Sequence, residues 1–209
     1  MKPTNSVKDL GVVISKDLSA RAHCNNIAKK ALRVVNLILC SFFSGNVVLL
    51  TRAYKTFARP ILEYSSSIWN PHCIPDINTI ERVQRYFTRR VLHSSNRNKI
   101  PYATRFQILG LDSLEPSRLQ SDLSIVHKII CHNVLPVNDY FSFNHNNTQA
   151  NNRYKLKVNH SKLDCRKYDF NNSDQSWNAL PDSVVSSPNP QNFNLKLSTV
   201  DLTPFLRGL

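Results

Sequence analysis

The chain is 209 residues long, and its 41% hydrophobic and 9% aromatic content is enough for a packed core, which argues against wholesale disorder. It carries 27 Lys and Arg against 14 Asp and Glu, a net charge of +13 that favours a polyanionic partner. Its five scattered cysteines include no Cys-x-x-Cys pair, so we expect free thiols in a reducing compartment rather than a disulfide framework or a zinc site.

The first predicted element is one short buried strand within residues 8–15, where a β-branched run follows Gly11. No partner strand lies nearby in the sequence, and an unpaired strand suggests a chain cut from something longer. Ser19 is then expected to cap a helix that Gly45 ends. The inward face of this helix is predicted to carry Cys24, Ile27, Ala31, Val34, Val35 and Ile38.

The second predicted helix starts at Asn46 and buries Leu49 or Leu50, Ala53, Tyr54 and Phe57. Pro60 is expected either to kink this helix or to begin a new one, because proline lacks a backbone donor. The apolar pattern then continues to Trp69 and ends at Asn70-Pro71. The uncharged run 34–51 is interrupted by polar residues, so it predicts a helical hairpin rather than a transmembrane span.

The third predicted helix, with Asp76 as its N-cap, has the clearest pattern in the chain. Its apolar residues recur at steps of three and four: Ile77, Ile80, Val83, Phe87 and Val91. At 100° per residue, Arg82, Arg85 and Arg89 fall within an arc of about 60° opposite that face. Their spacing of about 5 Å per turn is comparable with the rise between phosphates, and Tyr86 lies where a base or sugar could stack. The alternative is a solvated basic face.

Two further helices complete the predicted bundle. One runs from Pro101 to Leu109 and stops at Gly110, and the other follows Glu115-Pro116 with Leu119, Leu123, Val126 and Ile130 on one face. The expected fold class is therefore mainly α, a helical bundle preceded by one short strand.

The composition changes after Asn133. Residues 144–152 are almost entirely Asn, Gln and Thr, which is typical of a loop or linker, and residues 153–158 alternate like a half-exposed strand. Residues 177–180 predict a helical turn ended by Pro181, and a last amphipathic helix is expected to carry Phe193, Leu197 and Val200. This C-terminal region is predicted to be small, irregular and α+β.

Most of the positive charge lies early in the chain. Residues 1–132 carry 19 Lys and Arg against 8 acids, whereas residues 133–209 carry 8 against 6. Two stretches, Asp17 to Glu63 and Glu81 to Asp112, each hold seven bases and no acid between their ends. Ordinary surface helices interleave both signs, so this pattern favours a nucleic-acid partner. The candidate binding residues are Arg82, Arg85, Arg89, Arg90, Lys29, Lys30, Arg33, Lys55 and Arg59.

The sequence shows no catalytic constellation. A polymerase or nuclease commonly uses two or more carboxylates to hold paired metal ions, and no Asp-Asp pair occurs in the chain. Asp112, Glu115 and Asp122 fit capping and exposed helix positions better. With four glycines there is no phosphate-binding loop, and the histidines are dispersed.

Four pieces of the chain form a recognisable series: Lys8-Asp9-Leu10-Gly11-Val12; Tyr54-Lys55-Thr56 through Arg59-Pro60-Ile61-Leu62-Glu63-Tyr64 to Trp69-Asn70-Pro71; Glu81-Arg82-Val83-Gln84-Arg85 with Phe87-Thr88-Arg89-Arg90; and Trp177-Asn178-Ala179-Leu180-Pro181. In order and spacing these pieces resemble the C-terminal part of the second reading frame of non-LTR (LINE) retrotransposons of the jockey and CR1 type. The match covers nearly the whole chain, and the second piece is the most specific. Two places depart from the family pattern: Ser65, where relatives usually have Cys, and residues 169–175, where they usually place a Phe-rich helix containing Arg.

The resemblance implies an endonuclease and reverse transcriptase, an RNA-directed DNA polymerase that copies element RNA at a nicked target. In that family the Leu-Gly-Val strand follows the palm, and the helices after it resemble the thumb that holds the template-primer duplex through its backbone. The endonuclease, fingers and palm, with its Ala-Asp-Asp motif and Mg, lie upstream in the family and have no counterpart here. We therefore expect a truncated fragment that is inactive alone and carries no cofactor.

The expected organisation is a palm-edge strand (1–17), a basic helical thumb-like domain (18–132), an Asn-rich linker (133–152) and a small C-terminal region (153–209). The expected partner is RNA, DNA or an RNA/DNA hybrid, with no membrane and no small-molecule substrate, in an intracellular location, nuclear or cytoplasmic. The alternative is a free-standing basic RNA- or DNA-binding module with no polymerase role. A cut thumb should expose the apolar surface that met the palm, which separates the two hypotheses.

Overall fold

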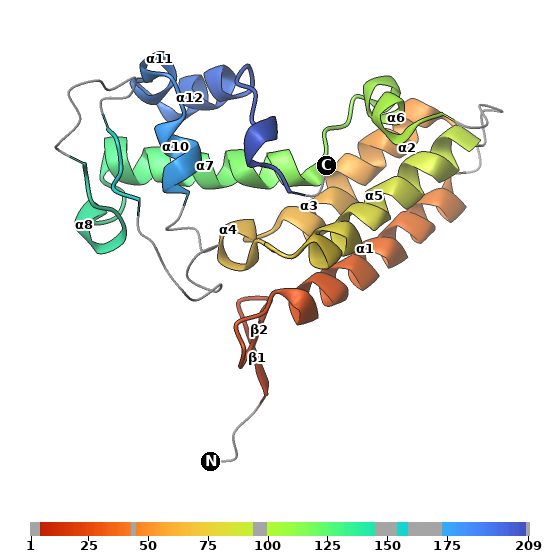
Figure 1. Ribbon diagram of the computed structural model, residues 1–209. Coiled ribbons are helices and arrows are strands. Elements are labelled where there is room, and N and C mark those ends of the chain that lie inside the picture. Colours follow the sequence, from red (N-terminus) through yellow and green to blue (C-terminus); the bar gives the residue numbers. More distant parts are fainter. Residues whose placement is uncertain (1–4, 43–44, 94–99, 145–153, 159–172, 208–209) are drawn as a thin grey trace. The chain divides into compact units, whose positions relative to one another are not determined.

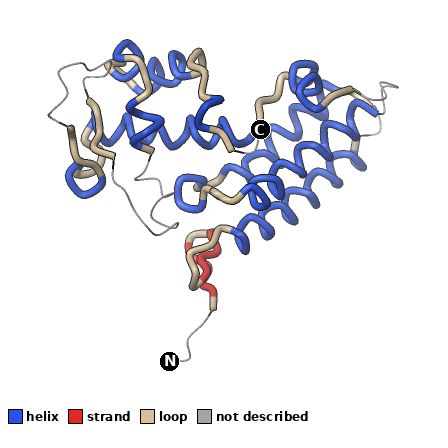
Figure 2. Tube along the Cα trace, viewed as in Figure 1, coloured by secondary structure: helices blue, strands red, loops and turns tan. Residues whose placement is uncertain are grey.

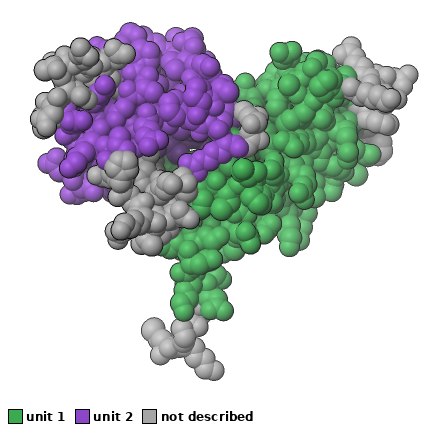
Figure 3. Space-filling view, in the orientation of Figure 1, with its two compact units in different colours: residues 1–115, 208 green, residues 116–207, 209 purple. Residues whose placement is uncertain are grey.

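The computed structural model describes residues 5–42, 45–93, 100–144, 154–158 and 173–207, and these residues are mainly helical (Figures 1 and 2). The expected mainly α class is confirmed. The chain divides into two compact units, which we call unit 1 (residues 1–115) and unit 2 (residues 116–207), each with its own apolar core (Figure 3). Among the described helices, none is both long and apolar enough to cross a membrane.

Unit 1 begins with a β-hairpin, so the prediction of one unpaired strand was wrong. Strand β1 (Ser6–Asp9) pairs antiparallel with β2 (Val12–Ser15), and Asp9 lies opposite Val12. Leu10 and Gly11 join them with positive φ angles of 42° and 91°, as the tight turn between paired strands requires. The side chains of β1 are all exposed, so the strand has no apolar alternation by which its sequence could be recognised.

Helix α1 (Arg21–Ser41) buries the face that its spacing predicts. Five of the six expected inward residues are buried and Val34 is half-buried: Cys24, Ile27, Ala31, Val35 and Ile38. The Ser19 hydroxyl accepts the Arg21 N–H at 3.3 Å, although the helix itself starts two residues later than that expected cap. Gly45 has a φ of 60°, and α2 (Val47–Ala53) begins just after it with Asn46 as its cap.

Pro60 lies in the first turn of α3 (Arg59–Glu63), within a helical path that is continuous from Val47 to Glu63. Between α2 and α3 the chain makes a π-helical turn, Tyr54–Ala58, in which the Arg59 N–H reaches back to the Tyr54 carbonyl. The wider turn changes which side chains face inward, so Phe57 is 61% exposed and its predicted burial was wrong. Helix α4 (Ser66–Trp69) follows Ser65, which has a φ of 52°.

Helix α5 (Ile74–His93) packs along α1, and α6 (Tyr102–Leu109) packs on α5 (Figure 1). The five predicted inward residues of α5 are all buried, and Phe87 stacks on Tyr54 with ring centres 4.2 Å apart. Asp76 is not the N-cap, because the helix starts two residues earlier; it lies in the first turn, buried, with its carboxylate 3.7 Å from Arg21. Gly110 ends α6 with a φ of 55°, as predicted.

Helix α7 (Leu114–His132) starts at the end of unit 1 and supplies the central helix of unit 2. The sequence predicted this helix as part of the helical domain 18–132. In the structure its apolar side chains pack with the C-terminal elements. These are α8 (Val137–Tyr140), α10 (Asp174–Asn178), α11 (Asp182–Val185), α12 (Pro190–Leu197) and a 3₁₀ turn (Thr203–Phe205). Trp177 and Phe193 lie fully buried in this core.

The predicted strand at residues 153–158 is reduced to a single antiparallel bridge between Leu156 and Phe143 among the residues described there. The Asn178 side chain takes the place of a partner strand, because it bonds both the N–H and the carbonyl of Leu156 at 2.8 Å. The predicted Asn-rich loop falls largely on residues 145–152, which lie outside the described ranges, as do Arg97, Lys99 and Cys165.

Candidate nucleic-acid interface

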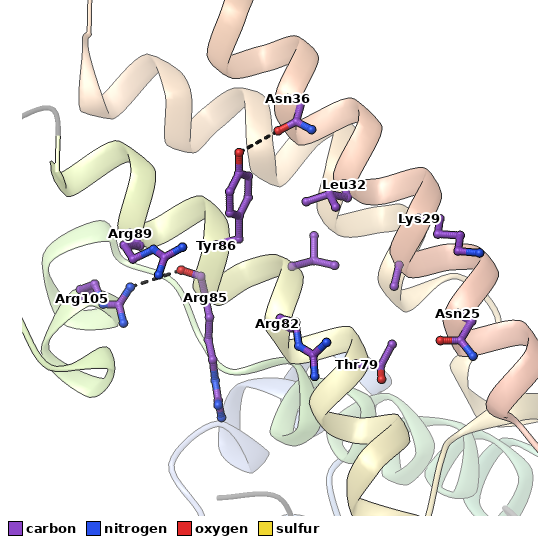
Figure 4. A pocket seen from close by; sticks show the side chains of 12 residues that line it. Asn25, Lys29, Leu32, Asn36, Thr79, Arg82, Arg85, Tyr86, Arg89 and Arg105 are labelled. Carbon is purple, nitrogen blue, oxygen red and sulfur yellow. Dashed lines mark hydrogen bonds between the residues drawn. The ribbon is translucent and has the colours of Figure 1, made fainter.

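A pocket of about 660 Å³ lies between α1 and α5 within unit 1 (Figure 4). We call it the basic groove. Helix α1 contributes Asn25, Ala28, Lys29, Leu32 and Asn36, helix α5 contributes Thr79, Arg82, Val83, Arg85, Tyr86 and Arg89, and α6 contributes Arg105.

Five cationic side chains from three helices line the groove: Lys29, Arg82, Arg85, Arg89 and Arg105. Among the described residues that line it, none is acidic. None of Arg82, Arg85 and Arg89 forms an ion pair with a carboxylate in the described part of the chain. Guanidinium groups gathered without counter-charges repel one another, and an anion that settles among them relieves that repulsion.

The floor of the groove is apolar. Ala28 and Val83 are buried there, and Leu32 remains 37% exposed. Tyr86 spans the groove beside them, and its hydroxyl bonds the Asn36 Oδ1 at 3.0 Å (Figure 4). The groove therefore combines a charged rim with an apolar and aromatic interior.

Tyr102 holds two of the arginines in place. The guanidinium carbons of Arg85 and Arg105 lie 4.9 and 5.1 Å from the centre of its ring, within the range of cation–π contacts. The Tyr102 hydroxyl donates to Glu81 Oε1 at 2.7 Å. Burial, and then the charge of Glu81 and this hydrogen bond, raises the pKa of Tyr102 above its ordinary value, so the hydroxyl stays protonated and keeps donating.

Glu81 is a structural carboxylate. It is 4% exposed, and it accepts hydrogen bonds from the Ser113 hydroxyl and from the Leu114 N–H, each at 3.3 Å. The second bond satisfies one of the free N–H groups at the start of α7, where a negative charge is also favoured by the helix dipole. Glu81 thus connects α5, α6 and the start of α7, and its hydrogen bond to the Tyr102 hydroxyl orients the Tyr102 ring.

Arg105 is the most enclosed cation of the groove. Its Nη1 donates to the Arg85 carbonyl at 3.2 Å and to Thr88 Oγ1 at 3.3 Å. Burial lowers the pKa of Arg105, and the charges of Arg89 and Arg85 lower it further against the opposing effect of Tyr102. Arginine remains protonated in proteins, so Arg105 keeps its charge.

The candidate binding residues divide into three groups. Lys29, Arg82, Arg85 and Arg89 line the groove, whereas Lys30, Arg33 and Arg90 are exposed but outside its lining. Lys55 and Arg59 hold the loop after α6: the Lys55 ammonium donates to the Gly110 carbonyl at 2.6 Å, and Arg59 pairs with Glu63 at 3.0 Å and reaches the Asp112 carbonyl at 3.5 Å.

Arg105 was not among the candidate residues. The sequence places it in an acid-free stretch, but it is sixteen positions beyond Arg89 and on a different helix, so helical periodicity cannot connect the two. Within the described residues, no three His, Cys, Asp or Glu side chains are grouped as metal ligands. The described chemistry of this site is thus that of arginine, lysine, amide and aromatic groups.

Comparison with known proteins adds little to this geometry. No protein-family model matches the chain, and no solved structure matches it. The chain is similar to an uncharacterised protein of Caenorhabditis elegans, with 25% identity over 126 residues. The similar region covers 60% of this chain and 64% of the relative, so the chain spans less than two thirds of the relative's own length.

Proposed function

We propose that unit 1 binds nucleic acid through the phosphate backbone, with the basic groove as the centre of the contact. The observation that carries the proposal is the convergence of five cations from α1, α5 and α6 on a groove whose described lining includes no acid. Unit 1 as a whole carries 17 Lys and Arg against 7 Asp and Glu, so its field attracts polyanions beyond the groove itself.

Arginine suits this task better than lysine does. Its planar fork makes two parallel hydrogen bonds to a phosphate, and its weak hydration lowers the cost of bringing it against an anion. Four of the five groove cations are arginines. Backbone contacts of this kind neutralise phosphates and release condensed counterions, so the binding should weaken steeply as salt is added.

We further propose that this binding belongs to a reverse transcriptase of the non-LTR retrotransposon type, in which unit 1 acts as the thumb and grips a template-primer duplex. The support is the ordered resemblance of four sequence pieces, one of which is the arginine-bearing part of α5. Polymerization itself needs a catalytic palm that supplies the metal-binding carboxylates. On this proposal the described residues of unit 1 hold the template-primer duplex, and the palm carries out polymerization.

A free-standing nucleic-acid-binding module is the second candidate, and one observation favours it. Strand β2, which follows the Leu10-Gly11 turn, is paired with β1 inside unit 1. The unit also has its own apolar core, but apolar side chains such as Leu10, Phe57 and Ile68 are exposed on it, as expected of a cut thumb. Both candidates share the basic groove and the backbone contact, so the same binding experiment tests that shared part.

The experiment measures the affinity of the purified chain for an RNA/DNA hybrid and for duplex DNA across a series of salt concentrations. The test variant changes Arg82, Arg85 and Arg89 together to Ala. With about two to three phosphate contacts removed, the slope of log affinity against log salt should flatten by about two to three for B-form DNA.

The matched control removes three exposed charges outside the groove: Lys16, Arg52 and Lys128. This control lowers the net charge by the same amount, so it should keep nearly the full slope of the parent. Equal flattening in both triple variants would show that only net charge matters. A folded parent chain with no salt-dependent binding would contradict the proposed function altogether.

A further inference from the structure

We infer that the basic groove holds an unpaired nucleotide, with its base on the apolar floor and its phosphates on the surrounding arginines. This inference rests on the first part of the proposed function, that unit 1 binds nucleic acid through its backbone, and not on the grip of a template-primer duplex. It makes that part more specific, because it names single-stranded rather than fully paired nucleic acid as the preferred ligand of the groove. The groove is thereby a binding site for a base as well as for a backbone.

The composition of the groove carries the inference. Phosphates alone need cations and hydrogen-bond donors, and they gain nothing from apolar surface. The groove nevertheless exposes Leu32 over buried Ala28 and Val83 and places the Tyr86 ring beside them. A nucleobase has an apolar face that such a surface covers and an aromatic ring that stacks on tyrosine.

The size and the polar groups of the groove fit the same ligand. A volume of about 660 Å³ lies within the range of pockets that enclose small organic ligands. Asn25 on α1 adds a side-chain amide that can donate and accept hydrogen bonds, as the edge of a base requires (Figure 4). The Asn36 Oδ1 already accepts from Tyr86, so its amide N–H groups are what it offers. The Thr79 hydroxyl donates to the Pro75 carbonyl at 2.8 Å, so it offers an acceptor. In Figure 4 Lys29 is drawn beside Asn25 and Arg82 beside Thr79, where flanking phosphates would be met.

A fully paired duplex cannot use this floor. Its bases are stacked and paired in the interior, so it presents phosphates and sugars to a groove between two packed helices. The apolar floor would then stay hydrated and would contribute no affinity. An unpaired nucleotide pays no cost of unstacking, and both the floor and the cations are used.

An acidic peptide is the competing occupant. It would satisfy the cations and could place an apolar side chain on the floor. The orientation of the cations favours the nucleotide, because Arg85 extends away from Tyr86 while Arg89 and Arg105 lie on the side of α5 toward α6 (Figure 4). Cations spread along both sides of α5 suit a strand that carries one phosphate at every nucleotide.

The first test uses the full chain and three DNA ligands with matched numbers of phosphates: single-stranded oligothymidylate of about 12 nucleotides, the same strand with every base replaced by tetrahydrofuran, and a blunt duplex. We expect the strand without bases to bind about tenfold more weakly, the size of one modest base stack, with the same salt slope. The duplex should also bind more weakly than the single strand at equal phosphate number.

The second test changes the floor. Leu32→Ser should lower the affinity for the oligothymidylate severalfold and leave the affinity for the strand without bases unchanged. Leu37→Ser is the matched control, because Leu37 lies on the same helix, is 66% exposed and does not line the groove. Both side chains are partly exposed, so we expect the variants to fold, and circular dichroism of each variant tests this.

Each outcome decides the inference. Equal binding of strands with and without bases overturns it, and so does equal loss of affinity in the two leucine variants. Those results leave backbone binding intact, so the inference can fail while the proposed function holds. If no nucleic acid binds, both fail. If a polyglutamate peptide displaces the oligothymidylate as effectively as a second oligothymidylate does, the acidic peptide is the better occupant and the inference is wrong.

Discussion

His23 fastens the N-terminal hairpin to α1. The side chain is 1% exposed, its Nδ1 accepts the Val13 N–H at 3.1 Å, and its ring centre lies 4.9 Å from that of Trp69. Because Nδ1 accepts, the neutral ring carries its proton on Nε2. A second proton would have to enter at Nδ1, and it would break the bond to Val13 in an apolar setting.

The free energy of unfolding should therefore fall in mild acid. Burial, and then the charge of Lys30, lowers the pKa of His23 below its ordinary value of 6.5. A lowered folded pKa means that the unfolded chain binds the proton more readily, so this stability is present above pH 6.5 and is lost as the pH falls from there through the folded pKa. Urea titrations between pH 8 and 5 measure the loss, which approaches about 1.4 kcal/mol per pH unit for each such proton.

The variant His23→Gln separates this residue from other titrating groups. A glutamine oxygen can still accept from Val13, but it does not titrate, so the acid loss should become shallower. Burial also lowers the pKa of His127 in unit 2, with His132 adding to the effect and the hydrogen bonds to Ser187 and Val185 opposing it. Part of the acid loss should accordingly survive in the variant. An unchanged pH profile would show that His23 does not contribute.

At the scale of elements, the turn of the hairpin holds a residue type that is unfavourable for its backbone conformation. Leu10 has a φ of 42° and is 84% exposed, so a bulky residue occupies a left-handed conformation without burying its side chain. Asparagine and glycine are the residues that usually occupy this position of a two-residue turn. The strain must be offset by strand pairing and by neighbours such as Tyr64, whose hydroxyl donates to the Leu10 carbonyl at 3.3 Å.

Leu10→Asn should raise the free energy of unfolding by about 1 kcal/mol, because asparagine tolerates the left-handed conformation. Gly11→Ala should act in the opposite direction by about 1–2 kcal/mol, because a φ of 91° disfavours any side chain. The added Cβ would meet Tyr64 at an ordinary 3.7 Å, so the effect is that of the backbone and not of a clash. The urea midpoints of the two variants test these predictions. If both midpoints rise or both fall relative to the parent chain, the assignment of the turn is wrong.

At the scale of the whole molecule, each unit contains one of the two tryptophans. Trp69 in unit 1 donates from Nε1 to the Tyr64 carbonyl at 2.8 Å, and Trp177 in unit 2 donates to the Tyr154 carbonyl at 2.9 Å. Both rings are buried. The variant Trp69→Phe therefore leaves Trp177 as the only fluorescent tryptophan, a reporter of unit 2. The variant Trp177→Phe leaves Trp69, a reporter of unit 1.

Damage to one core should appear mainly in the reporter of that unit. Leu123 is fully buried in unit 2, and Leu123→Ala should cost about 2–5 kcal/mol through the cavity that it leaves. We expect this change to lower the denaturation midpoint reported by Trp177 and to leave the midpoint reported by Trp69 and the binding of nucleic acid nearly unchanged. Coincident shifts of both reporters would instead show that the two cores unfold as one.

The sequence alone determined the features that depend on neighbours within one helix. The two faces of α5, the buried stripe of α1 and the stop at Gly110 follow from a repeat of 3.6 residues and from the freedom of glycine. The separation of apolar and basic residues on α5 is of this kind, and so is the concentration of charge in the first part of the chain. These properties are local or additive, so no knowledge of the packing is needed to predict them.

Only the tertiary structure decided which cations meet. It brought Arg105 beside Arg85 and Arg89, it engaged Lys55 and Arg59 with the loop after α6, and it made a groove where α1 and α5 pack. It also paired β1 with β2, which periodicity could not reveal because β1 has no buried face. Each of these outcomes depends on contacts between residues far apart in the sequence or on backbone pairing without an apolar pattern, and a helical repeat carries no information about either.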